Sequence, residues 1–210
     1  SARHMRAVRR WVTLADKGCA VAWSSQDAPL VQFGNVALPY APFPRTMGHD
    51  EPATVFSWIH NNLWDTNFPS AQGFEFTFRY SLACAPTADG LGPRTAAAFS
   101  RPLRAVRARG PVASGAATHA FAEVDDPRVR LVGMTVPRPG EVLLRLQSFA
   151  HEAVDCRVLT RFPVAAAYRA DYLGTKGAAL GAVDRADGAG AVTTLAVPPL
   201  ATAALLLVRP

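Results

Sequence analysis

The chain has 210 residues, of which half are hydrophobic and 18% are charged, so a packed core is feasible and global disorder is excluded. No run of about 18 apolar residues occurs, so we expect no transmembrane helix. The formal net charge of +6 comes almost entirely from arginine, because Lys17 and Lys176 are the only lysines. An excess of arginine and alanine is typical of a GC-rich genome, so this charge is weak evidence for an anionic partner.

Apolar and polar residues alternate along most of the chain, which is the period of a β-strand. We expect strands at residues 11–14, 19–24, 55–59, 74–80, 129–136, 142–146, 154–159 and 203–208. Turn-forming residues separate many of these runs, at residues 16–18, 137–140 and 187–190. The only helical candidate is residues 95–100, which Pro102 limits.

Many short strands with regular turns predict an all-β fold, an antiparallel β-sandwich. A small-residue, turn-rich segment at residues 109–117 predicts a domain boundary. We therefore expect a first β unit over residues 1–117 and a smaller terminal β-sandwich over residues 118–210.

Residues 61–68 combine amides, a carboxylate, a hydroxyl and two aromatic rings within eight positions. In a sugar-binding loop, Trp64 would stack on a pyranose, and polar neighbours would bind its hydroxyls. These predicted substrate-binding residues are Asn61, Asn62, Trp64, Asp65 and Asn67. In a structural turn, Trp64 would instead plug the end of the sandwich while the amides bind turn backbone. Both interpretations stay open.

The order of segments around this loop resembles the C-terminal β region of family 38 glycoside hydrolases, the retaining α-mannosidases. A strand at residues 57–60 leads into the Asn-Asn-x-Trp-x-Thr-Asn-Phe loop, and Gln72-Gly73 leads into an aromatic strand. Residues 141–146 and 171–174 resemble a strand and a turn of the family's terminal small sandwich. The resemblance implies part of a galactose-mutarotase-like supersandwich, followed by that small sandwich. Residues 198–201 depart from the family pattern, because they lack its glutamate.

No catalytic or metal-binding set is expected within this chain. The five histidines are scattered without ligand spacing, and Asp125-Asp126 precedes Pro127, a composition typical of turns. The resemblance places the carboxylate nucleophile and a zinc ion in an N-terminal catalytic domain. We therefore expect an inactive, non-catalytic region that braces its own catalytic domain and lines an α-mannoside cleft. The alternative is a stand-alone carbohydrate-binding module without hydrolase activity.

A basic run of arginines is a further candidate for a binding surface. Arg101, Arg104, Arg107 and Arg109 could contact phosphates, but aromatic residues are not interleaved with them. We expect a solvated or interdomain surface there, with neither nucleic acid nor membrane as a partner. A domain that binds acidic partners is a third hypothesis.

The three cysteines predict no disulfide or metal site. Cys84 and Cys156 lie in alternating apolar patterns, so we expect both thiols to be buried.

Overall fold

The structure is a computed structural model that describes residues 5–36, 53–60, 67, 71, 73–107, 120–184 and 190–210. The chain divides into two compact units, Ser1–Ala105 and Val106–Pro210. The boundary predicted after residue 117 falls outside the described residues and stays a prediction.

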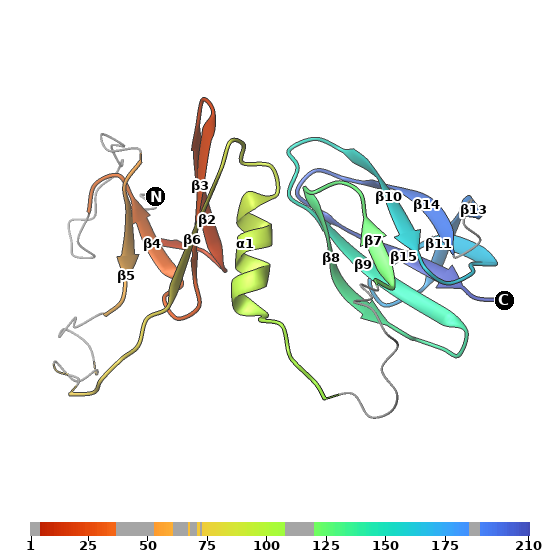
Figure 1. Ribbon diagram of the computed structural model, residues 1–210, viewed down its shortest axis with the longest axis horizontal. Coiled ribbons are helices and arrows are strands. Elements are labelled where there is room, and N and C mark those ends of the chain that lie inside the picture. The colour runs from red at the N-terminus through yellow and green to blue at the C-terminus, as the bar shows by residue number, and fades with distance from the viewer. Residues whose placement is uncertain are drawn as a thin grey trace. The chain divides into compact units, whose positions relative to one another are not determined.

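The first unit contains two antiparallel sheets and a helix in its described part (Figure 1). One sheet has the order β1-β4-β5 and the other β2-β3-β6. The elements are β1 (Arg6–Ala7), β2 (Trp11–Asp16), β3 (Cys19–Ser25), β4 (Leu30–Phe33), β5 (Val55–Trp58), β6 (Tyr80–Ala85) and α1 (Leu91–Ser100).

Helix α1 packs on one face of the β2-β3-β6 sheet, where the strands offer small side chains. Ala20 and Ala22 of β3 are fully buried there with Leu91 of the helix. At Gly92 the approach is so close that an added Cβ would collide with the Trp11 indole and the Thr13 hydroxyl. Glycine is therefore required at this position for the helix to lie on β2.

The helix begins four residues earlier than the predicted segment 95–100. Glycine and proline have low helix propensity, so Gly92 and Pro93 do not indicate a helix and its first turn is not predicted from the sequence. In the first turn, however, a backbone N–H has no partner within the helix, so proline is tolerated there.

The second unit is a sandwich of two antiparallel sheets, with strand orders β13-β14-β10-β7 and β12-β11-β15-β9-β8. Its strands are β7 (Ala122–Val124), β8 (Val129–Thr135), β9 (Glu141–Ser148), β10 (Val154–Thr160), β11 (Ala166–Ala170), β12 (Lys176–Leu180), β13 (Ala182–Asp184), β14 (Ala191–Val197) and β15 (Thr202–Val208). β15 pairs with β9 over its whole length, from Thr202 opposite Gln147 to Val208 opposite Glu141.

One continuous apolar core lies between these two sheets. Alternate residues of both sheets point into it, and the fully buried ones include Leu144, Leu146, Val158, Leu195, Leu205 and Leu207. Such interdigitation of two inner faces defines a β-sandwich. The predicted all-β, antiparallel sandwich fold is confirmed, and α1 is the one helix among the described residues.

Candidate functional site

The predicted sugar-binding loop falls mostly outside the described residues. Asn61, Asn62, Trp64 and Asp65 lie outside the described residues, and Asn67 is exposed in a bend. The substrate-binding role of these five residues therefore stays a prediction.

The β2-β3-β6 sheet presents an apolar surface on the side opposite α1. Across its three strands, Val12 pairs with Trp23 and Trp23 pairs with Leu82, so these side chains share that side. Val12 is buried and Trp23 is half-buried, whereas Leu82 is 69% exposed. The uncovered part of this side therefore lies along β6.

Alternate large apolar residues extend this uncovered region along the chain before β6. We call Phe74, Phe76, Phe78, Tyr80 and Leu82 the apolar stripe. The ring centroids of Phe74 and Phe76, and those of Phe76 and Phe78, are each 6.3 Å apart, so the three rings contact one another in series. Phe74 is 78% exposed.

The sequence correctly indicates alternation at residues 74–80, but it assigns too long a strand. Residues 73–79 belong to no strand, and the ladder with β3 covers only Tyr80–Ala85. The alternation predicts that these aromatic side chains share one face of a strand. Among the described residues, Phe74, Phe76 and Tyr80 are exposed.

Polar contacts hold the stripe's backbone in place. The Asp27 carboxylate accepts hydrogen bonds from the Arg79 backbone N–H at 2.8 Å, Nε at 3.0 Å and an Nη at 2.7 Å. The Arg79 side-chain bonds, and then its backbone N–H, lower the pKa of Asp27 below its ordinary value. The Tyr80 ring lies 5.5 Å from the Trp23 ring, and its hydroxyl is 3.2 Å from the Ser57 hydroxyl.

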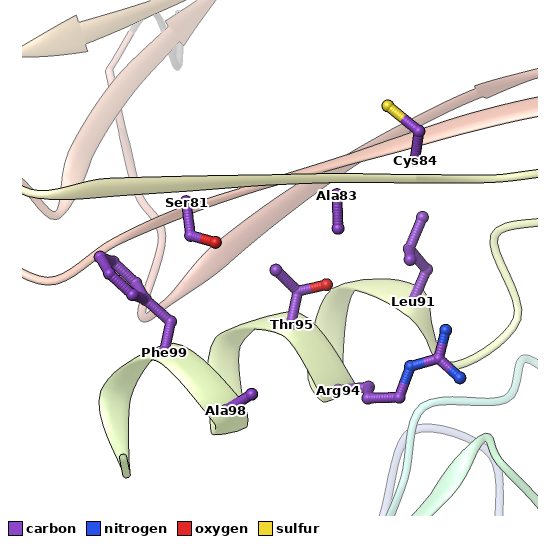
Figure 2. Close-up of a pocket in the computed structure, with 8 residues that line it drawn as sticks. All are labelled: Ser81, Ala83, Cys84, Leu91, Arg94, Thr95, Ala98 and Phe99. Carbon is purple, nitrogen blue, oxygen red and sulfur yellow. The ribbon is translucent and has the colours of Figure 1, made fainter.

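A groove of about 480 Å³ runs between α1 and β6 on the other face of this sheet. Figure 2 shows Leu91, Thr95 and Phe99 pointing from the helix toward β6, at the four-residue spacing of one helix face. Ser81 and Ala83 point back toward the helix, whereas Cys84 points away from it. We call this the α1/β6 groove.

Three polar side chains border the α1/β6 groove without a partner in the described part of the chain: Ser81, Thr95 and Arg94. By contrast, the Ser100 hydroxyl, one turn further on, donates to the Ala96 carbonyl at 2.6 Å. The C-terminal turn of the helix is also tied to the sheet, because the Gln26 amide donates to the Phe99 carbonyl at 2.6 Å. The groove walls are thus anchored, while its polar groups are free to bind a ligand.

Two carboxylates of the second unit hold turns together. Asp126 accepts hydrogen bonds from the backbone and side chain of Arg128, which forms the turn predicted at Asp125-Asp126. Asp171 accepts hydrogen bonds from the backbone N–H groups of Thr175 and Leu173 in its turn, and these bonds, that from Thr175 above all, lower its pKa. The partners of both carboxylates are therefore backbone N–H groups and, for Asp126, the Arg128 side chain.

The cysteine prediction is right for Cys156 and wrong for Cys84. Cys156 is fully buried in the sandwich core, and this burial raises the pKa of its thiol to about 11. Cys84 is exposed, because alternation along β6 puts it on the side that carries Leu82. Alternation predicts which residues share a face but not whether that face is covered.

Among the described residues, no group of three His, Cys, Asp or Glu side chains could hold a metal ion. No helix in that part of the chain is long and apolar enough to cross a membrane. A scan against protein-family models found no match, and a search of curated proteins found none either.

Proposed function

We propose that this chain is a non-catalytic C-terminal β region of an α-mannosidase-like retaining glycoside hydrolase, similar to family 38. Its role is to brace the catalytic domain and to line part of the sugar cleft. The proposal is supported by the order of motifs around residues 57–82, and the observation that carries it is the exposed apolar stripe.

An uncovered stripe of this size is costly for a protein that works alone. Contiguous exposed apolar patches of more than a few hundred Å² commonly mark interaction surfaces. Burial of each Phe or Leu side chain contributes about 1.5–3 kcal/mol. The exposure of Phe74, Phe76 and Leu82 in the apolar stripe therefore fits a face that another domain covers.

In this proposal the chemistry belongs to the catalytic domain, which by resemblance contributes the carboxylate nucleophile and the zinc ion. The chain's own side chains supply a rigid, apolar support. The purified chain should therefore not hydrolyse an aryl α-mannoside, and measurable turnover would overturn the assignment of a non-catalytic role.

Binding to a catalytic domain tests the role of the stripe. A separately produced family 38 catalytic domain from the same genome should bind this chain in titration calorimetry. Leu82→Glu should abolish binding by burying a charge, whereas Leu103→Glu, at an exposed leucine outside the stripe, should not. Equal affinities for the two variants would contradict docking through the stripe.

A stand-alone carbohydrate-binding module is the second proposal, because exposed aromatic rings also stack on sugars. His60, which directly precedes the 61–68 loop, contacts Phe76 with ring centroids 4.9 Å apart. This alternative expects mannose or an oligosaccharide to bind the isolated chain, with loss of binding in Trp64→Ala. Absence of heat with every mannoside tested would eliminate it.

A further inference from the structure

The α1/β6 groove has the size and lining of a small-molecule site that is separate from the apolar stripe. Its volume of about 480 Å³ lies within the range of about 300–1,000 Å³ typical of ligand pockets. Leu91, Ala83, Ala98 and Phe99 give it apolar walls, and none of its lining residues is acidic.

The polar groups of the groove are few and available. A threonine inside a helix can direct its hydroxyl to the carbonyl four residues earlier, yet Thr95 makes no such bond within the described residues. The Thr95 and Ser81 hydroxyls come from facing elements, and both are half-buried. A ligand placed between helix and strand can bond to both hydroxyls without breaking any bond within the described protein.

The two ends of the groove differ in chemistry. Figure 2 shows the Arg94 guanidinium at the end near Leu91, and the Phe99 ring at the opposite end. Phe99 follows Arg94 by five positions in the α-helix, a rise of about 7.5 Å along the axis. That spacing suits a molecule with an anion at one end and a ring or branched chain at the other.

We propose that the α1/β6 groove binds a small organic carboxylate that has a compact apolar body. Arg94 pairs with the carboxylate, and its fork of N–H donors matches the two carboxylate oxygens. Ser81 and Thr95 bond to polar atoms of the ligand. Phe99 and Ala83 cover the apolar body.

Nuclear magnetic resonance titration of the full chain with 3-phenylpropionate tests this proposal. Saturable shifts should appear at the backbone amides of Ser81, Arg94, Thr95 and Ala98, with a dissociation constant of about 1 mM for so small a ligand. The uncharged analogue 3-phenylpropanamide should bind about fivefold more weakly, because it lacks the charge that Arg94 pairs with. No saturable shift at these amides up to about 10 mM would overturn the proposal.

Amino-acid substitutions distinguish binding in the groove from nonspecific attraction of an anion to a basic protein. Arg94→Gln should weaken 3-phenylpropionate binding about fivefold, whereas Arg104→Gln removes an equal charge outside the groove and should leave it unchanged. Thr95→Val should weaken binding about threefold, and the free protein should stay folded because the hydroxyl has no described partner. Equal weakening by Arg94→Gln and Arg104→Gln would overturn the proposal.

Discussion

The two units solve the problem of covering β-sheets in different ways. In the second unit each of the two sheets covers the other, and their inner faces share one core of fully buried leucines and valines. In the first unit, α1 covers one face of the β2-β3-β6 sheet over small alanines, while the apolar stripe remains exposed on the described part of the other side. The second unit thus buries its apolar inner faces within itself, whereas the described part of the first unit leaves an apolar side exposed.

The largest contrast is expected between matched leucine truncations in the two units. Leu205→Ala removes a fully buried side chain from the sandwich core and should lower the free energy of unfolding by about 2–5 kcal/mol. Leu82→Ala, in the stripe, should change the free energy of unfolding by about 0.5 kcal/mol or less, because truncation of an exposed side chain removes few contacts. Guanidinium unfolding of both variants measures the difference, and similar losses would show that Leu82 is covered within the chain.

A smaller effect should come from the close contact of α1 with β2. Gly92→Ala places a methyl group against Trp11 and should destabilise the first unit by about 1–3 kcal/mol, the usual cost of overpacking. Ala97→Gly, elsewhere on the same helix, serves as a control that costs about 1 kcal/mol through helix propensity alone. Unchanged stability in Gly92→Ala would mean that the helix does not lie this close to the sheet.

The smallest expected effect is a pH dependence at the stripe. The pKa of Asp27 is lowered in the folded chain by Arg79, so this pair stabilises the fold above the ordinary carboxyl range. That contribution is lost as the pH falls through that range toward the folded pKa. The stability difference between wild type and Asp27→Asn should therefore shrink as the pH is lowered, as thermal unfolding at a series of pH values would show. A difference independent of pH would contradict the pairing.

Sequence patterns predicted the fold class because strand alternation is a local property. The runs at residues 11–14, 19–24, 154–159 and 203–208 all lie within observed strands. β12 was missed, because its Lys-Gly-Ala-Ala-Leu sequence lacks alternation and depends on pairing with β11. Edge strands of this kind are specified by their neighbours rather than by their own residues.

The candidate surfaces were less predictable than the fold. The sequence placed the aromatic residues 74–80 on one side, but nothing local indicates whether another element covers them. The α1/β6 groove was missed altogether, because Ser81 and Thr95 come from elements that meet only in the folded unit. The unpartnered state of their hydroxyls leaves no sequence signal.

Hydrogen–deuterium exchange, measured with and without a family 38 catalytic domain, tests the central claim most directly. If the stripe is a docking face, amides of residues 73–85 should become protected when the catalytic domain is added, while those of β15 in the second unit's core should not change. Protection absent from residues 73–85, or confined to the second unit, would contradict the claim that the apolar stripe braces a catalytic domain.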